Sequence, residues 1–596
     1  MAVPIQHRSR VRRARESPVS TTMNDIDESI KDCLIIGFHD PSFSDFVEMM
    51  RGTGEDTGAF RDLNLTFTEV GGVPLRCLDL INHLMTEAGM PPDTPYENCD
   101  FVWPVVLYLG SFLHRRGFSF DYVSLFHREK DELPERFEGK RFRSVVITTT
   151  VYVSPQPIIE IVEYLRSIGI DAPIIIGGPY ISNQHKVMSE DELSLLFNFI
   201  GGDVYVISSE GETTLAKIIA RLKAGESLDG IPNIAVASAD GAAFDFHPLE
   251  TERNELHDEP IDYSLFGPEA IGRFVSLRTA KSCPFNCNFC GFPQRAGNYV
   301  YTDLDYVERE LDAIAELGTV STLTFLDDTF NVPKGRFKSI LRLMIDRGYG
   351  FRWNSFYRSD HGDAETIELM AASGCEGVFL GIESGCDRIL ELMNKAARKK
   401  HYGAAIDKFR EVGITTYGSF IIGFPGETRD SVFETMEFIE THAPTFYRAQ
   451  LFYLDPATPV WRDREKLGVV GGGFEWRHPT MDNHEASALI EHMFVTIRNS
   501  VWCPQNGFED WSIYYLMRHG FSRDDVISFV RGFNELVGMK FVTPDNPSAR
   551  SDVMARLRNI AIAARRRYLA ESSAPMPVPR PRTALSRAKV LPILPQ

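Results

Sequence analysis

Residues 274–290 read FVSLRTAKSCPFNCNFC, an apolar strand-forming run that passes directly into a loop with three cysteines. Cys283, Cys287 and Cys290 have the spacing C-x3-C-x2-C. Three thiolates on one short loop can ligate three irons of a four-iron cluster and leave the fourth iron open to another ligand. A structural zinc ion would need four protein ligands, and no fourth Cys or His follows nearby. The segment therefore predicts a [4Fe-4S] cluster at the end of a strand.

The run before the cysteines begins a regular alternation of strands and helices. Strands are predicted at 276–279, 322–326, 352–356, 377–381, 416–422 and 447–453. One helix-length segment separates each strand from the next. Six β/α units of this length predict a partial (β/α)6 barrel of the TIM type, in which the reactive groups lie on the loops that follow the strands.

A second alternation of short apolar runs and helical segments lies upstream, from about residue 32 to 234. Its apolar runs include CLIIG at 33–37, SVVIT at 144–148 and PIII at 173–176. This pattern is typical of a doubly wound, Rossmann-like parallel sheet. Ligands of such sheets bind outside the carboxyl ends of the strands, where this chain is rich in Gly, Ser and Thr.

The length of 596 residues predicts three to four domains, and the fold class is α/β. Residues 1–30 are predicted to be a disordered basic extension, 31–235 the Rossmann-like domain, 236–270 a linker, 271–470 the partial barrel, 471–570 a mostly helical domain and 571–596 a disordered tail. The basic run between residues 8 and 15 is also compatible with an organellar transit peptide, but we favour a disordered extension.

The composition excludes several classes of protein. The 63 Lys and Arg against 82 Asp and Glu give a net charge of −19, which argues against a nucleic-acid binder. The nine cysteines are an odd number scattered along the chain without a secretory signal, so a disulfide framework is not expected. No run of 18 apolar residues occurs, and no membrane span is predicted. We expect a cytoplasmic protein that acts on a small molecule, without nucleic acid or membrane.

The three-cysteine loop, with a strand before it and a helix after it, resembles the signature of the radical S-adenosylmethionine (SAM) enzymes. In that family the open iron chelates the amino and carboxylate groups of SAM, and one-electron reduction cleaves SAM to a 5′-deoxyadenosyl radical. The resemblance implies SAM contacts at Phe289, Asp327, Asp328, Arg358, Glu383, Ser384 and Gly418. Asp327 and Asp328 stand where many members have Gly-Gly-Glu. For Arg358, a surface salt bridge is the alternative role. Residues 418–427 look like the family's fifth-strand motif beside the adenine, and for Glu427 at its end the alternative is an N-cap contact in the following helix.

The α/β unit before the barrel resembles the cobalamin-binding domain of B12-dependent radical SAM enzymes, and this likeness covers residues 32–470. It implies cobalamin contacts on the loops that follow the strands, at Thr148, Thr149, Ser154, Gly177, Gly178, Pro179, Tyr180, Glu210 and Gly211. A doubly wound domain without a ligand is the alternative. The unit has no D-x-H-x-x-G motif, so no cobalt-binding histidine from such a loop is expected.

The runs RTAKSC at 278–283, CGFPQRAG at 290–297 and GFHDPSF at 37–43 look like those of natural-product methylases, which include phosphinate P-methylases and aminocoumarin pyrrole C-methylases. This resemblance implies methyl transfer from SAM via methylcobalamin to an unactivated carbon or a phosphinate phosphorus, as in antibiotic biosynthesis. It also implies an external electron donor of the flavodoxin or ferredoxin type.

Two other activities stay open at this point. The first is a B12-dependent rearrangement or cyclisation without net methyl transfer, which would use the same cofactor sites. The second is a methylthiotransferase or tRNA-modifying activity, which the net charge and the absence of a further cysteine triad disfavour. No catalytic residue is assigned.

Overall fold

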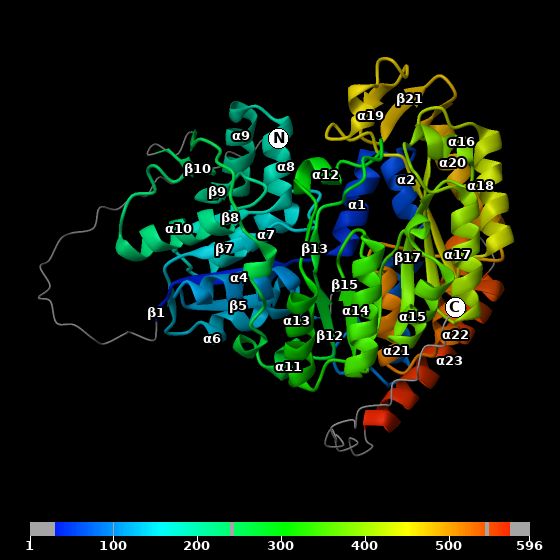
Figure 1. Ribbon diagram of the computed structural model, residues 1–596, viewed down its shortest axis with the longest axis horizontal. Coiled ribbons are helices and arrows are strands. Elements are labelled where there is room, and N and C mark those ends of the chain that lie inside the picture. The colour runs from blue at the N-terminus through cyan, green and yellow to red at the C-terminus, as the bar shows by residue number, and fades with distance from the viewer. Residues whose placement is uncertain (1–29, 99–100, 239–242, 543–546, 573–596) are drawn as a thin grey trace, which may run out of the picture.

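The computed structural model describes residues 30–98, 101–238, 243–542 and 547–572. The predicted extension and tail lie outside the described residues, except that Ile30 begins strand β1 (Ile30–Lys31) and helix α23 (Pro547–Ser572) includes Glu571 and Ser572. Two α/β halves, each built on its own sheet, lie side by side (Figure 1). The predicted α/β fold class is confirmed.

The first sheet has the strand order β11-β10-β9-β8-β7-β2-β5. Its parallel strands are β2 (Cys33–Phe38), β5 (Phe120–Leu125), β7 (Val145–Thr148), β8 (Ile174–Gly177) and β9 (Val204–Val206), and its antiparallel strands are β10 (Ile234–Ala237) and β11 (Phe244–Phe246). The chain passes from β2 outward to β5 and then to β7 on the other side of β2. The strand order therefore reverses between β2 and β7, and a crevice at such a point is where ligands of open α/β sheets bind.

Helices cover both faces of this sheet. Cys33 and Ile35 of β2 share a core with helices α4 (Pro104–Arg115) and α10 (Glu212–Ala224). Leu34 and Ile36, which point the other way, share a core with α7 (Gln156–Ser167) and α9 (Glu190–Ile200). Because both faces are buried, the strand is apolar along its whole length instead of alternating with polar residues.

The second sheet contains seven parallel strands in chain order. They are β12 (Phe274–Leu277), β15 (Thr322–Phe325), β16 (Arg352–Phe356), β17 (Cys375–Glu383), β18 (Thr415–Ile422), β19 (Phe446–Leu451) and β23 (Val501–Trp502). The helices between the first six strands include α13 (Leu304–Leu317), α14 (Lys334–Arg347), α15 (Ala364–Ala372), α17 (Lys399–Glu411) and α18 (Arg429–His442). All six predicted strands occur, and β23 was not predicted.

The two faces of the second sheet have different surroundings. One face lies under helices, where Trp353 contacts Phe337 of α14 and Phe420 contacts Phe438 of α18. The opposite face, here called the inner face, carries the register partners Ser276, Thr324 and Asn354, the partners Phe379 and Tyr417, and Gln450 of β19. Polar residues on this face predict that it borders a ligand site instead of an apolar core.

Residues 43–98, here called the insertion, follow β2 and leave the first sheet. They form α1 (Phe43–Thr53), α2 (Gly58–Asn64), β3 (Thr68–Val70), β4 (Val73–Leu75) and α3 (Cys77–Glu87). The blue helices α1 and α2 lie beside elements of the second half (Figure 1). Asp62 pairs with Arg448 of β19 at 2.6 Å, and Arg61 pairs with Glu491 at 2.7 Å. The insertion therefore packs on the second half although it precedes most of the first in sequence.

The segment predicted as mostly helical contains α20 (Asn483–Thr496), α21 (Asp510–Arg518), α22 (Arg523–Val542) and α23. It also contains strands. A small antiparallel sheet is formed by β20 (Val470–Gly472), β21 (Glu475–His478) and β22 (Met481–Asp482), and β23 extends the second sheet. Helices make up most of the segment, but it is not separate from the second sheet, because β23 pairs directly with β19.

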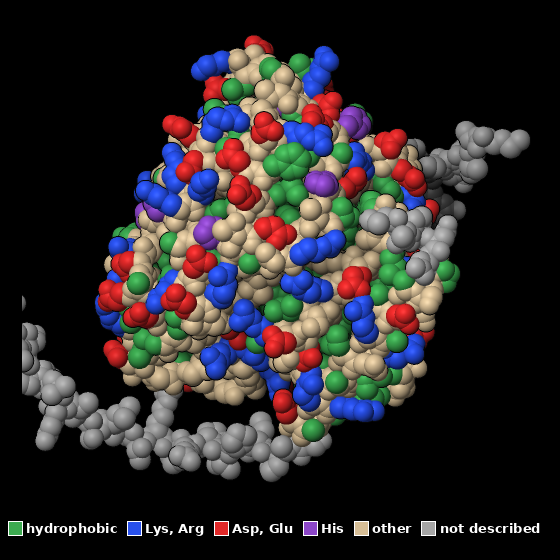
Figure 2. Space-filling view, turned by 90° about the vertical axis from the view of Figure 1, so that its right-hand side faces the viewer, with side chains coloured by type: hydrophobic (Ala, Val, Ile, Leu, Met, Phe, Trp, Pro, Cys, Tyr) green, Lys and Arg blue, Asp and Glu red, His purple; other side chains and the backbone are tan. Residues whose placement is uncertain are grey.

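The surface carries charges of both signs. On the face shown in Figure 2, Lys and Arg side chains alternate with Asp and Glu, and neither sign gathers into one large patch. Among the described residues, every helix is too short or too polar to cross a bilayer.

Candidate active site

The three cysteines lie on a loop that is closed at its base. Strand β13 (Ala280–Lys281) pairs antiparallel with β14 (Val300–Tyr301), so residues 282–299, here called the cysteine loop, leave and return at one point. The hydroxyl of Ser282 donates to the carbonyl oxygen of Gly297 at 2.6 Å, which adds a second closure. Cys287 is buried, Cys283 and Cys290 are half-buried, and all three are free thiols. The three cysteines thus lie in a loop after the first strand of the second sheet, where the sequence predicted them.

Asp327 fixes the base of this loop. One carboxylate oxygen accepts the backbone N–H groups of Thr279 at 2.6 Å and Ala280 at 2.8 Å, and the other accepts the Thr279 hydroxyl. Asp327 is 1% exposed. Its carboxylate is thus engaged by the chain itself. Asp328 is exposed at the surface of the loop. The protein atoms packed around its carboxyl still remove water from it, and this desolvation raises its pKa to about 7. Of the two aspartates, Asp328 is the one whose carboxylate is available to a ligand.

The donor set of the loop fits an iron–sulfur cluster. Among the described residues, no three Cys, His, Asp or Glu side chains converge on one point as the ligands of a single ion do. A cluster takes its thiolates at separate irons, so its ligands need not converge in that way. Burial, together with the neighbouring Cys287 and Cys283, raises the pKa of Cys290 to about 11. Three soft sulfur donors without an oxygen ligand match iron–sulfur chemistry better than a hard cation.

Glu383 ends β17 in a strained conformation. Its φ is +68°, which L-residues other than Gly rarely adopt, and such strain gathers at functional sites. Its carboxylate pairs with Lys395 at 2.8 Å, and both side chains are almost fully buried. The Lys395 ammonium lies 5.5 Å from the centre of the Phe289 ring in the cysteine loop. The structure therefore brings Glu383 and Phe289 together around one lysine, which sequence reasoning had not singled out.

Other predicted SAM contacts are held by local interactions. Arg358 pairs with Asp360 at 2.8 Å and lies 3.5 Å from the centre of the Phe285 ring in the cysteine loop. The salt bridge considered as its alternative role is therefore present. The Ser384 hydroxyl contacts that of Thr435 at 3.3 Å and accepts the N–H of Cys386. Gly418 lies inside β18.

Glu427 closes the turn that follows β18. Its carboxylate accepts the N–H of Gly423 at 2.6 Å, and its second oxygen is buried without a partner among the described residues. Burial raises the pKa of Glu427 to about 8. The side-chain cap of α18 comes from Thr428, so the N-cap role considered for Glu427 is wrong.

At the carboxyl edge of the first sheet, the predicted cobalamin contacts belong to three neighbouring loops. The Thr148 hydroxyl donates to Gly37 at 2.8 Å, and the Thr149 hydroxyl donates to Gly177 at 3.0 Å. These hydroxyls therefore join adjacent strands. Gly178 has φ +115° and a Cβ there would lie 3.0 Å from the Thr149 oxygen, so only glycine fits.

The other predicted cobalamin contacts lie close by. Pro179 is exposed and begins α8 (Pro179–Val187), whereas the next residue, Tyr180, is buried. Ser154 is half-buried, and Gly211 precedes α10. The structure thus gathers the predicted residues on one edge of the first sheet.

The carboxyl edges of the two sheets face each other. Glu210, on the loop after β9, forms an ion pair with Lys281, two residues before the first cysteine. The side chains are 29% and 20% exposed. A second contact on the same loop joins Lys186 of α8 to Ser209 at 2.9 Å. The base of the cysteine loop is therefore bound to the edge where the first sheet would take a ligand.

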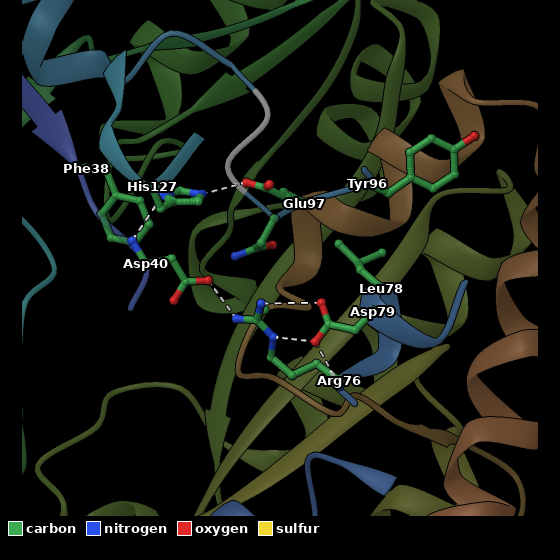
Figure 3. Close-up of a pocket in the computed structure, with 10 residues that line it drawn as sticks. Phe38, Asp40, Arg76, Leu78, Asp79, Tyr96, Glu97 and His127 are labelled. Atoms are coloured by element: carbon green, nitrogen blue, oxygen red, sulfur yellow. Dashed lines mark hydrogen bonds and ion pairs between the residues drawn. The ribbon is translucent and has the colours of Figure 1, made fainter. Parts of the chain in front are cut away.

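A small pocket lies at the carboxyl ends of β2 and β5 and is bordered by the insertion (Figure 3). Arg76 donates to Asp40 at 2.7 Å and to Asp79 at 2.8 Å, and His127 contacts Glu97 at 2.7 Å. Because these charges pair with one another, the pocket is best explained as a junction between the halves. The run GFHDP at 37–41 was a sequence signal for this place, but its partners were not predictable.

Comparison with known proteins agrees with this geometry. Residues 277–439 match the model of the Radical SAM superfamily. An uncharacterized methyltransferase of Pyrococcus horikoshii is 26% identical over 50% of this chain and 65% of its own length. The bacteriochlorophyllide d C-12(1)-methyltransferase of Chlorobaculum tepidum is 27% identical over 58% of this chain and 70% of its own length. The chain thus spans about two thirds of these relatives.

Among solved structures, the radical SAM methyltransferase TsrM from Kitasatospora setae, with cobalamin and a [4Fe-4S] cluster bound, superposes with a TM-score of 0.54. It is 17% identical, and the match covers 77% of this chain and 96% of TsrM. At this identity the likeness concerns the fold. Residues 277–439 of the chain are therefore a radical SAM domain, set within a fold that the chain shares with TsrM.

Proposed function

We propose that the chain is a B12-dependent radical SAM methyltransferase, which moves a methyl group from SAM via methylcobalamin to an unactivated carbon or a phosphinate phosphorus of a secondary-metabolite intermediate. The ion pair between Glu210 and Lys281 carries the proposal. It holds a loop of the first sheet's ligand edge against the base of the cysteine loop. A methyl donor and a radical source must reach the same substrate atom, and this contact supports a position of their sites next to each other.

Cys283, Cys287 and Cys290 would hold the [4Fe-4S] cluster, and SAM would bind at its open iron. When bound, these groups supply the one-electron chemistry, while the protein binds and orients them. Asp328 is available for an ammonium group, since its carboxylate is exposed. Glu383 and Phe289, joined through Lys395, would lie beside the nucleoside part of SAM.

Cobalamin would lie between the Rossmann-like first sheet and the inner face of the second sheet, which we interpret as a partial barrel. The reversal of strand order between β2 and β7 supports this position, because it opens a crevice at the carboxyl edge. Since Thr148 and Thr149 use their hydroxyls between strands, contacts from Ser154, Gly178 and Tyr180 would carry more of the binding. We further propose a cytoplasmic enzyme that receives electrons from a flavodoxin or a ferredoxin.

The test is an anaerobic reconstitution of the full chain with iron, sulfide, hydroxocobalamin, SAM and a low-potential reductant. We expect about one corrin per chain by absorbance, and methylcobalamin together with S-adenosylhomocysteine by mass spectrometry. A Cys287→Ala variant should lose the iron and the cleavage of SAM. Wild-type protein that takes up iron but no corrin would overturn the cobalamin part of the proposal.

The same assay separates the alternative activity. An enzyme that rearranges or cyclises its substrate would form 5′-deoxyadenosine with bound corrin but no S-adenosylhomocysteine in the presence of its substrate. That result would replace methyl transfer by a rearrangement while keeping the three cofactors.

A further inference from the structure

Arg278 lies just after the carboxyl end of β12, three residues before Lys281, which pairs with Glu210 of the first half. It directly follows Leu277, the last residue of β12, and comes two residues after Ser276 of the inner face. Its neighbours Leu277 and Thr279 are 1% and 0% exposed, whereas Arg278 itself is exposed. The charged side chain of Arg278 is thus exposed although the residues on both sides of it are buried.

The guanidinium of Arg278 has no carboxylate partner among the described residues. Its Nε donates to the carbonyl oxygen of Ala280 at 3.2 Å, which leaves both terminal nitrogens for another group. Lys281, three residues later, is in contrast paired with Glu210. An arginine offers a planar pair of donors that matches an oxyanion with two oxygens.

The surroundings of Arg278 come from both halves of the molecule. Burial raises the pKa of Asp328, which follows β15, and that of Glu212 at the start of α10, and the nearby charge of Arg278 opposes both shifts. Neither carboxylate is within ion-pair distance of it in the described chain. Arg278 therefore lies in the space between the two carboxyl edges, near carboxylates that would repel a group with two negative charges.

We propose that Arg278 binds a singly charged oxyanion of the methyl acceptor, a carboxylate or a phosphinate, between the two sheets. This inference rests on the proposed function, since it assumes that an acceptor enters this space. The acceptor would carry one monoanionic group with two oxygens. This group would be separate from the atom that receives the methyl. The α-carboxylate of SAM is the other source of the same chemistry, and the test distinguishes the two.

The first test is chemical labelling of arginines with phenylglyoxal in the full, reconstituted chain, followed by peptide mass spectrometry. We expect Arg278 to be modified in the absence of ligand. Phenylphosphinate or benzoate, used as monoanionic probes, should slow its labelling several-fold, and SAM alone should not. Arg273 at the opposite end of β12 is also exposed and serves as the internal control that no probe protects.

Labelling of Arg278 that neither probe slows would overturn the inference. Protection by SAM alone would also overturn it, because the bound oxyanion would then be that of SAM. These outcomes are read from the labelled peptide and do not depend on methyl transfer. A failure of corrin uptake, measured separately, would count against the proposed function instead.

The second test compares Arg278→Gln with Arg273→Gln in calorimetric titrations of phenylphosphinate. Loss of a charged, two-point contact predicts binding about tenfold weaker in Arg278→Gln. Arg273→Gln should bind as the wild type does. Equal affinity of the two variants would contradict the assignment, and thermal unfolding of both checks that each variant is folded.

Discussion

At the scale of single residues, Asp327 has a role that differs from its neighbour's although the two are adjacent. Its carboxylate accepts two backbone N–H groups and a hydroxyl at the base of the cysteine loop. These donors are buried, so removing their acceptor leaves them without hydrogen bonds. The cost of such a loss is larger than the net worth of the bonds themselves.

We therefore predict that Asp327→Ala destabilises the protein by about 2–3 kcal/mol and lowers its iron content after reconstitution. Asp328→Ala, which changes an exposed carboxylate, should leave both nearly unchanged. Urea unfolding and an iron assay measure the two effects. Wild-type iron content in Asp327→Ala would show that the base of the loop needs no such anchor.

The sequence predicted the cysteine loop because its ligands are local, within eight residues of one another. The partners of Asp327 lie 47 and 48 positions upstream, and no periodicity reports such a distance. The same limit applies to Lys395, which joins Glu383 to Phe289 of the distant cysteine loop. Residue types and spacing thus predicted a candidate site, but the contacts that fix each side chain depended on the fold.

At the scale of elements, the pairing of β23 and the packing of the insertion are features that the hydrophobic periodicity of the sequence did not predict. The β23 strand is two residues long, too short to have a pattern of its own. The six longer strands were predicted because each is an apolar run followed by a helix. The insertion contains recognisable helices, but their packing on β19 depends on single ion pairs such as Asp62 with Arg448.

Breaking the ion pair between Asp62 and Arg448 is expected to destabilise the folded protein. Arg448 is fully buried, and its Nε and one terminal nitrogen already lack partners among the described residues. Asp62→Ala removes its carboxylate, so we expect unfolding to become easier by about 3 kcal/mol. Asp56→Ala, an exposed position in the same insertion, is the matched control. Equal urea midpoints for the two variants would contradict the prediction.

Helix α13 contacts the linker through the buried side chain of Glu310. Glu310 accepts the N–H of Ile261 at 3.0 Å and lies 3.4 Å from the Tyr263 hydroxyl, and burial raises its pKa to about 7. The folded protein then binds more protons than the unfolded chain between about pH 4.5 and 7. The stabilisation from protonated Glu310 is complete below that window and is lost as the pH rises through about 7.

Glu310→Gln should remove this pH dependence. We predict that the difference in unfolding free energy between wild type and variant changes by on the order of 2 kcal/mol from pH 5 to pH 8, with the wild type losing stability relative to the variant. Thermal or urea unfolding over that range measures it. Parallel pH profiles would mean that Glu310 titrates normally.

At the scale of the whole molecule, the two halves are joined at their carboxyl edges by Glu210 and Lys281. We predict that Lys281→Met weakens cobalamin binding several-fold in the full chain, because the corrin-side loop loses its contact with the second half. Glu210→Gln should have a similar effect, and the double variant should be no worse than either single change. Lys217→Met, an exposed charge on α10, is the control. Additive losses measured by corrin absorbance would show that the pair does not act as a unit.

The insertion also bears on how such a protein can be divided or recombined. A gene cut in the linker near residue 250 separates a second half that still needs residues 43–98, which remain with the first. The cut would uncover Arg448 and the adjoining edge of β19, to which the insertion supplies Asp62. The two halves are therefore not interchangeable cassettes. A chimera that joins the first half of one relative to the second half of another would need an insertion that matches the new second half. The insertion comes with the first half, so we expect the two halves to have been inherited together.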